Sequence, residues 1–261
     1  EFGISSKTAI LSFIIAFGIT KAITNYFAGK LANSFGRKNL LIVGWLFAIP
    51  IPFILINAAS WNWVVFANIL LGINQGLTWS STVVMKIDLV GKKNRGLAMG
   101  INEFSGYFAV GIIALFTGII AENYGVTPYP FYLGIGISII GLLLSILFVR
   151  DTRVFVNKEQ ENIKIDKLDK VFIDTTFKNK TLSSITQAGL VNNLNDGMIW
   201  GLLPILLFSI NYNSEKIGII AAIYPIVWGI GQLFTGRMAD IYSKKEMLFL
   251  VSAGMKNHLS K

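Results

Sequence analysis

The chain has 261 residues, of which 53% are apolar, 14% are charged and none is cysteine. Its mean hydropathy of +0.60 and its few charged residues exclude an ordinary soluble domain and predict a polytopic membrane protein. The lack of cysteine excludes disulfides and thiolate metal sites, and the net charge of +9 comes without the soluble basic face that a nucleic-acid partner needs.

A helix needs about 20 mostly apolar residues to cross the hydrocarbon core of a bilayer. The expected fold class is therefore an all-α, polytopic transmembrane helix bundle with seven full spans, at 8–29, 39–57, 62–84, 96–120, 130–149, 184–210 and 216–235. An eighth apolar run, 246–255, is too short to cross and counts as a partial span. The chain starts at Glu1 without a recognisable signal peptide, and we expect both ends to be truncated.

The basic residues predict the orientation of these spans. Eighteen of the 23 fall in the segments 30–38, 85–95, 150–182 and 236–245, which alternation of the spans places on one side. That side is the cytoplasm by the positive-inside rule. We therefore expect a multi-pass protein of the plasma membrane, the cytoplasmic (inner) membrane of a bacterium or archaeon, with the basic loops inside.

The longest connection divides the chain into three parts. Residues 1–149 hold five spans and form an N-terminal helical bundle. Residues 150–182 carry mixed charge and little apolar periodicity, as is typical of a solvated linker, here cytoplasmic. Residues 183–261 then form the truncated start of a C-terminal bundle, with two spans and a stub.

A short basic segment occurs twice between spans. It reads GKLANSFGRK at 29–38 and returns, less regular, as GRMADIYSKK at 236–245. This repeat resembles the signature of the major facilitator superfamily of transporters, roughly Gly-x-Leu-Ala-Asp-Arg-x-Gly-Arg-Arg/Lys, which lies between helices two and three and again between helices eight and nine. The first copy matches at Gly29, Leu31, Ala32, Gly36, Arg37 and Lys38, and the second keeps Gly236, Ala239 and Asp240. The resemblance covers the whole chain as the second to eighth of twelve helices, with one helix missing in front and three to four behind.

The resemblance implies a secondary-active transporter that moves a small-molecule solute by alternating access, with proton coupling left open and no cofactor. In the family, the two loops hold the cytoplasmic gate closed; the gating residues implied here are Gly29, Asn33, Gly36, Arg37, Lys38, Gly236, Arg237, Asp240 and Lys244. Asn33 replaces the usual acid, so the first loop would hold the gate through hydrogen bonds. Asp240 in the second loop could still hold it through a charged contact. The alternative is that the first loop is only a short basic turn.

Three charges lie well inside predicted spans: Lys21, Glu103 and Asp196. A charge at that depth costs several kcal/mol unless it faces protein or water, so each is a functional candidate. Lys21 and Glu103 lie at compatible depths for pairing, although separate gate partners are an equal alternative. Lys21 could also extend its long side chain to the membrane interface.

Two polar stripes complete the predicted substrate or ion pathway. Asn192, Asp196 and Trp200 recur every four residues with Asn195 beside them, and Asp196 lies near the bilayer midplane, where transporters bind solute. Asn68, Gln75, Trp79, Thr82 and Lys86 share one face of the third span. Asparagines that only pack helices together would give the same pattern. The family often has an arginine three residues before Gln75-Gly76, but this chain has Gly72 there, which weakens the link to proton coupling.

Other classes of function fit less well. An intramembrane enzyme needs a cluster of reactive groups, but the only histidine is His258 in the tail and Asp196 has no second acid nearby. We therefore do not expect an enzyme or a metal site. The alternatives left open are a channel-like or receptor-like polytopic protein and a non-functional fragment of a carrier. The expected partners are a small solute, the lipid bilayer and, as an open case, protons.

Overall fold

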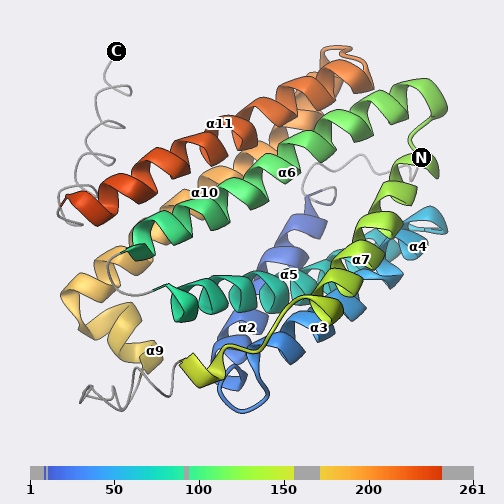
Figure 1. The fold of residues 1–261 in the computed structure, drawn as a ribbon. Helices are drawn as coiled ribbons and strands as arrows, with labels where there is room; N and C mark the ends of the chain where they lie inside the picture. Colours follow the sequence, from blue (N-terminus) through green and yellow to red (C-terminus); the bar gives the residue numbers. More distant parts are fainter. Residues whose placement is uncertain (1–8, 10, 91–93, 156–170, 243–261) are drawn as a thin grey trace, which may run out of the picture.

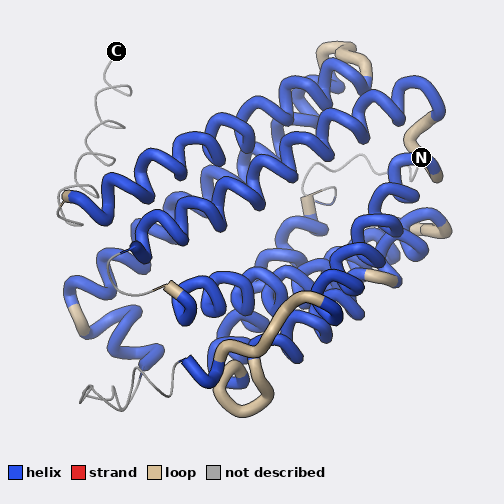
Figure 2. The backbone as a smooth tube through the Cα atoms, viewed as in Figure 1, coloured by secondary structure: helices blue, strands red, loops and turns tan. Residues whose placement is uncertain are grey.

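The computed structural model describes residues 9, 11–90, 94–155 and 171–242, and all regular structure in this part of the chain is helical (Figures 1 and 2). The elements are α2 (Ser12–Leu31), α3 (Arg37–Ala48), α4 (Pro50–Ile56), α5 (Trp61–Leu89), α6 (Arg95–Tyr124), α7 (Tyr129–Leu147), α9 (Val171–Ile173), a π-helical turn (Asp174–Lys178), α10 (Lys180–Ser209) and α11 (Ser214–Ile241). The predicted all-α fold is confirmed.

Each of the seven predicted spans coincides with a helical segment. α3 and α4 form one of them, because Ile49 between them keeps helical angles (φ −55°, ψ −49°) and Pro50 begins α4 where proline is tolerated. In the described part of the chain, the helices long and apolar enough to cross a membrane are Arg37–Ile56, Arg95–Tyr124, Tyr129–Leu147 and Ser214–Ile241. The predicted partial span at 246–255 lies outside the described residues.

The other three segments, α2, α5 and α10, have 20, 29 and 30 residues, which is enough length to cross at about 1.5 Å per residue. They carry the polar residues that the sequence placed in the pathway, among them Lys21, Gln75 and Asp196. Polar side chains lower the mean hydropathy of a helix, and a spanning helix tolerates them where they face protein or a cavity rather than lipid.

The helix ends differ from the expected loop boundaries. α2 continues to Leu31, so Gly29 is helical and the connection to α3 spans only 32–36. α11 continues to Ile241, so the first six residues of the second copy of the motif are helical too. Basic residues mark where the chain leaves the hydrocarbon core of the membrane, but they also form helices readily. A helix can therefore continue past that point, and it ends only where its backbone hydrogen bonds stop.

α2, α3 and α5 pack around a core of Ala28, Ala32, Leu40 and Leu77, and α7 packs on α3 and α4. α2 approaches α5 closely. A Cβ atom at Gly72 would lie 2.8 Å from the backbone oxygen of Phe17, so no side chain fits there. The arginine that the family often carries at this position is therefore excluded by the packing of α2 against α5.

α6 packs along its length on α11, although it belongs to the first half of the sequence (Figure 1). The seam between them is lined by glycine: a Cβ atom at Gly118 would lie 2.8 Å from the Cα of Gly218, and one at Gly236 would lie 2.9 Å from the Cα of Gly100. Small residues let helix backbones approach closely in a membrane, where packing drives helix association. The two halves of the sequence therefore meet at the α6–α11 seam.

Large apolar side chains cover the outside of the molecule. Leu147, Phe208 and Phe234 are 68%, 74% and 67% exposed, and many others resemble them. Water would not solvate such a surface, but lipid chains do. Together with the apolar helices, this surface identifies a multi-pass membrane protein.

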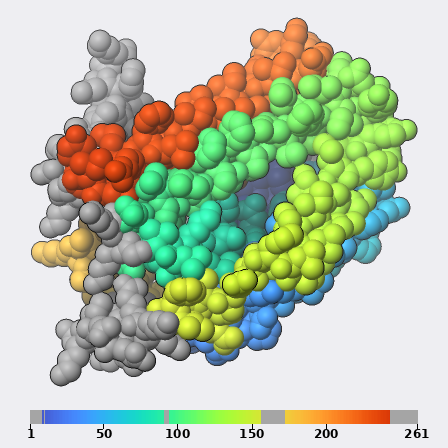
Figure 3. Space-filling view, viewed as in Figure 1, coloured from blue at the N-terminus to red at the C-terminus, as the bar shows by residue number. Residues whose placement is uncertain are grey.

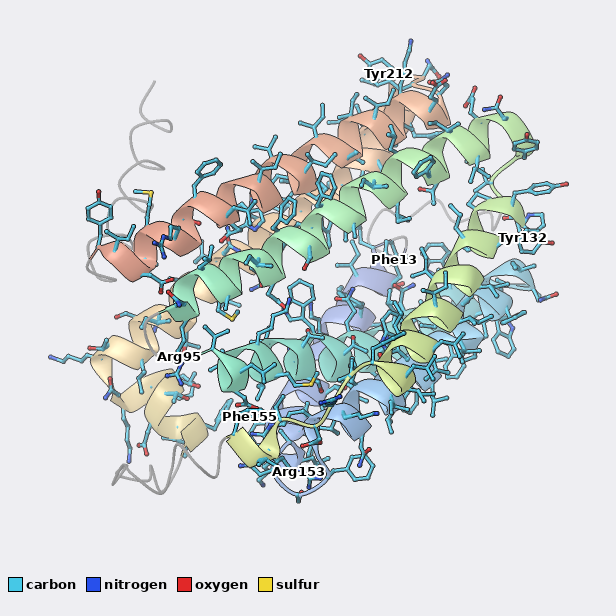
Figure 4. The ribbon with its side chains drawn as sticks, in the orientation of Figure 1. Phe13, Arg95, Tyr132, Arg153, Phe155 and Tyr212 are labelled. Carbon is cyan, nitrogen blue, oxygen red and sulfur yellow. The ribbon has the colours of Figure 1, made fainter. Side chains whose placement is uncertain are left out.

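The helices run between two ends of the molecule. Figure 4 places Arg95, Arg153 and Phe155 toward one end, and Tyr132 and Tyr212 toward the other. The described parts of the four basic segments gather at the first end, which we call the basic end. Their predicted location on a common side agrees with this arrangement, while the assignment of that side to the cytoplasm stays a prediction.

Candidate functional site

The Asp196 carboxylate lies near the middle of α10, sixteen positions after Lys180 and thirteen before Ser209. The residue is 5% exposed. The Tyr107 hydroxyl, on α6, donates a hydrogen bond of 2.9 Å to its Oδ2 atom, and the Tyr224 hydroxyl, on α11, donates to its Oδ1 atom. One buried acid thus joins three helices that come from both halves of the sequence.

Aromatic rings surround these three groups. The Tyr107 ring lies with its centroid 6.5 Å from that of Trp79, 6.4 Å from that of Trp200 and 6.1 Å from that of Trp228. The Tyr224 ring lies 6.2 Å from the Trp228 ring. We call these five rings and the Asp196 carboxylate the aromatic cluster. The cluster draws residues from α5, α6, α10 and α11, close to the middle of each helix.

The two asparagines that the sequence grouped with Asp196 lie differently. Asn195 is exposed, and its Nδ2 atom donates a hydrogen bond of 3.3 Å to the Tyr224 hydroxyl. Asn192 is half-buried. Asn193, by contrast, is exposed and donates to the backbone oxygen of Gly189 in its own helix. Asn195 therefore touches the cluster through a tyrosine rather than through Asp196.

Lys21 and Gln75 contact each other directly. The Lys21 ammonium donates a hydrogen bond of 3.2 Å to Oε1 of Gln75, and it lies 5.5 Å from the centroid of the Phe17 ring. Gly72 packs on the same helix, α2, where a Cβ atom would lie 2.8 Å from the backbone oxygen of Phe17, 2.9 Å from Cβ of Thr20 and 3.1 Å from the backbone nitrogen of Lys21. α2 thus supplies a cation that bonds to α5 at Gln75, three residues after the position where the resemblance had suggested an arginine.

Glu103 and Lys86 meet through a shared neighbour. The Lys86 ammonium donates a hydrogen bond of 2.9 Å to Asn102, and the Asn102 side chain lies 3.5 Å from the Glu103 carboxylate. Among the described residues, the ion pairs shorter than 4.0 Å join other groups, so Lys21 and Glu103 are not directly paired.

The first loop is held by a buried ion pair. Gly36 turns the chain with a φ of +94°, which a residue with a side chain rarely adopts. Arg37 follows at the start of α3, and its Nε atom lies 3.0 Å from Oδ2 of Asp88 at the end of α5, with both side chains less than 10% exposed. Arg37 also donates to the backbone oxygen of Ala32, and the Thr152 hydroxyl donates to Asp88 at 2.6 Å. The loop's charged contact therefore comes from Asp88, while Asn33 is exposed.

A second acid secures the same loop from the segment after α7. The Asp151 carboxylate accepts hydrogen bonds from the backbone N–H groups of Lys38 and Arg153 and from the Arg153 guanidinium, and Arg153 also reaches the Ser34 backbone oxygen. Burial alone would raise the pKa of Asp151, but these hydrogen bonds favour the charged form and lower the pKa below its ordinary value of 3.8. The Lys38 ammonium donates to the backbone oxygen of Ile146.

The second copy of the motif makes its contacts across the two halves. The Asp240 carboxylate accepts hydrogen bonds of 2.7 Å each from the backbone N–H groups of Gly96 and Leu97, at the start of α6. Gly236 lies one turn earlier, against Gly100 in the glycine-lined seam. Arg237 is exposed, and Lys244 lies outside the described residues.

The opposite end of the same helix pair carries a matching contact. Glu122, near the end of α6, accepts a hydrogen bond of 2.9 Å from the backbone N–H of Ser214 and one of 3.3 Å from the Asn213 side chain, at the start of α11. Carboxylates are favourable at helix N-termini because the first N–H groups lack partners within the helix. The α6–α11 pair is thus capped at both ends.

Reasoning from sequence missed several of these residues, among them Tyr107, Tyr224, Trp228 and Asp88. Tyr107 follows Glu103 by four positions and so shares its helical face, which is the one pattern that pointed to it. The others gain their role only from helices far apart in sequence.

The space-filling view shows a hollow between α6 and α7, with α2 visible in its depth (Figure 3). In the described part of the chain, no group of three or more histidine or acidic side chains could hold a metal ion.

Comparison with known proteins supports the resemblance. The proton-coupled antiporter flippase LtaA of Staphylococcus epidermidis is 28% identical over 260 residues, which cover 96% of this chain and 60% of that protein. The multidrug resistance protein MdtG of Rahnella sp. is 23% identical over 249 residues, which cover 92% of this chain and 58% of that protein. This chain therefore spans about 60% of the length of these curated relatives.

A solved structure, the inward open conformation of the xylose transporter XylE from E. coli, gives a TM-score of 0.49 at 18% identity and covers 96% of this chain and 60% of that one. The family model described as Major Facilitator Superfamily matches residues 1–255. With nearly the whole sequence inside that match, this chain belongs to the Major Facilitator Superfamily.

Proposed function

We propose that this protein is a secondary-active transporter that moves a small solute across the membrane by alternating access. The observation that carries the proposal is the buried Asp196 carboxylate, held at the middle of its span by tyrosines from two other helices. A charge at that depth is rarely kept without a function. Transporters bind solutes and coupling ions near the midplane, where their repeated halves meet.

The coupling ion that we propose is the proton, with Asp196 as its carrier. One relative, LtaA, is named a proton-coupled antiporter flippase. In this chain, Asp196 is an acid at the interface of the halves, in hydrogen-bond contact with Tyr107 and Tyr224. Protonation of Asp196 would neutralise its carboxylate and weaken the hydrogen bonds that both tyrosine hydroxyls donate to it. This would change how α10 is held against α6 and α11.

In this proposal the two halves are residues 1–149 and 183–261, with residues 150–182 as the linker between them. The α6–α11 seam joins the halves, and its end contacts limit how they move. Asp240 at the basic end and Glu122 at the opposite end are the contacts that would open in turn as the cleft changes sides. We place the basic end in the cytoplasm of a bacterial or archaeal cell, following the positive-inside rule.

A test of this function does not require the solute. The chain has no native cysteine, so single cysteines can report on access. Asn68→Cys and Thr82→Cys lie on the same face of α5, on either side of Gln75. A membrane-impermeant maleimide applied from one side at a time, at pH 5.5 and at pH 7.5, then measures which end is open.

We expect the two cysteines to change accessibility in opposite directions when the pH changes, since a carrier opens one end at a time. In an Asp196→Asn background, the response to pH should disappear. Asn193→Ala, on the same helix but exposed, serves as the control and should respond like the parent. Labelling of both positions from both sides at once would identify a channel and contradict the proposal.

A further inference from the structure

We propose that the basic end carries a binding site for an anionic phospholipid, formed by a row of exposed aromatic rings with lysines beside it. The row joins the end of α2 to the segment before α10, and both lie at this end of the molecule (Figure 1). We call it the aromatic row, and its members are Phe27, Tyr26, Phe172 and Phe177. The inference goes beyond the proposed function, because a lipid bound at this surface is not the solute that a midplane site takes.

Direct ring contacts hold the row together. The centroid of the Tyr26 ring lies 5.6 Å from that of Phe27 and 6.1 Å from that of Phe172. The Phe172 centroid lies 6.4 Å from that of Phe177, and all three pairs meet edge to face, which is a favourable arrangement. The row therefore connects a spanning helix of the first half to the described part of the linker.

The row is exposed at the depth where a membrane meets water. Its four rings are between 50% and 70% exposed. Tyr26 lies five residues before Leu31, the last residue of α2, which is about 7 Å along the helix axis. Aromatic side chains are enriched at this depth in membrane proteins, where they lie at the level of the lipid headgroups. The neighbour that covers the row is therefore the headgroup region of the bilayer.

Lysines determine the charge of the lipid that fits. The Lys30 ammonium lies 5.6 Å from the centroid of the Tyr26 ring, and Lys178 and Lys180 are exposed in the same segment as the two phenylalanines of the linker. Among the described residues, no acid lies within ion-pair distance of any of the three lysines. Asp174, the one acid of that segment, is half-buried. The surface beside the row therefore carries net positive charge.

The rings and the lysines together select an anionic phospholipid. A phosphate group accepts charge-assisted hydrogen bonds from ammonium groups. A free phosphate ester has this charge but no apolar part to cover the rings. A choline lipid has both parts, but its own ammonium group cancels the charge. Each lysine near the surface strengthens binding to anionic lipid about fivefold.

Native mass spectrometry of the purified, delipidated protein measures the binding. The probes are dioleoylphosphatidylglycerol, dioleoylphosphatidylcholine and, as the free headgroup phosphate, glycerol 3-phosphate. We expect the first lipid to bind at least tenfold more tightly than the second, and glycerol 3-phosphate to show no saturable binding. Unfolding temperatures show whether each variant is folded.

Two lysines give a matched pair of variants. Lys30→Gln should reduce the preference for the anionic lipid about fivefold. Lys216→Gln is the control and should leave it unchanged. Lys216 is also exposed and lies 5.8 Å from the centroid of a tyrosine ring, Tyr212, but at the opposite end of the molecule.

Hydrogen exchange in nanodiscs locates the lipid. Replacing phosphatidylcholine with phosphatidylglycerol should slow amide exchange of a peptide covering residues 171–180 at least threefold in the parent, but not in Lys30→Gln. Phe172→Ala removes the ring between Tyr26 and Phe177 and should lose the same protection. Phe116→Ala should keep it, since Phe116 is a similarly exposed ring on α6.

Three results would overturn the inference: equal affinity for the two lipids, equal effects of the two lysine variants, or exchange in residues 171–180 that does not depend on the lipid. Binding of glycerol 3-phosphate as tight as that of the lipid would also contradict it, because the rings would then have no part in recognition. The comparison of Lys30→Gln with Lys216→Gln stays decisive even if Phe172→Ala does not fold, since both lysines lie at the surface.

Discussion

The Glu122 carboxylate, near the end of α6, accepts a 2.9 Å hydrogen bond from the backbone N–H of Ser214, the first residue of α11. At the basic end, Asp240 of α11 accepts two bonds of 2.7 Å from the first turn of α6. Each helix of the pair thus caps the N-terminus of the other. The two contacts lie at opposite ends of the helix pair.

The first prediction concerns these two caps. Loss of a capping carboxylate costs about 0.5–2 kcal/mol and acts on the turn that it caps. Asp240→Ala should therefore increase amide hydrogen exchange at the start of α6, and Glu122→Ala should do so at the start of α11. Hydrogen exchange read by mass spectrometry on peptides from both starts distinguishes the two. If either variant loosened both starts equally, the caps would not act independently.

The second prediction concerns the glycine-lined seam. A Cβ atom at Gly218 would lie 2.9 Å from both the Cα of Gly118 and the backbone oxygen of Ala114, so Gly218→Ala forces the helices apart. Overpacking of this kind costs about 1–3 kcal/mol and should lower the unfolding temperature in detergent. Gly231→Ala, on the same helix, meets nothing within 4 Å and is the control. It should leave that temperature unchanged or raise it, since alanine favours helix. Equal losses in the two variants would show that the seam is not the cause.

The third prediction concerns the buried pair of Arg37 and Asp88. Removing one partner leaves an uncompensated charge, which costs about 3–5 kcal/mol. Arg37→Ala should therefore destabilise the protein strongly, while the double variant with Asp88→Asn should lose less than the sum of the single losses. Lys38→Ala is the neighbouring control, with an expected change within about 0.5 kcal/mol, because its ammonium lies at the surface. Additive losses in the double variant would mean that the pair does not interact.

The fourth prediction concerns Asp151 and pH. Its pKa is lowered in the folded protein, so its contribution to stability is complete above the ordinary value of 3.8 and is lost as the pH falls through the lower folded value. The difference in unfolding temperature between the parent and Asp151→Asn should therefore be largest at neutral pH and shrink below about pH 4. Thermal unfolding of both proteins across that range measures it. A difference that stayed constant or grew at low pH would contradict the hydrogen-bonded carboxylate.

Local composition was sufficient for much of the organisation. The apolar runs predicted the spans, because the hydrocarbon core imposes a length and a polarity on any helix that crosses it. The same cost made Lys21, Glu103 and Asp196 stand out, since a charge within a span is rare. The repeated motif was readable from Gly36, Arg37 and Asp240 because its turn and its charges are local features.

Tertiary structure decided which groups meet. Sequence spacing relates residues on one helix, so it linked Asn192 to Asp196 but could not bring Tyr107 and Tyr224 to the same carboxylate from two other helices. Nor could it choose Asp88 as the partner of Arg37, fifty-one residues away. The sequence by itself therefore determined where the chain crosses the membrane and which charged residues lie within the spans. The packing of α6 against α11 and of α2 against α5 determined which residues those charged residues contact. Contacts between helices depend on how two helix surfaces fit together, and no local sequence pattern encodes that fit.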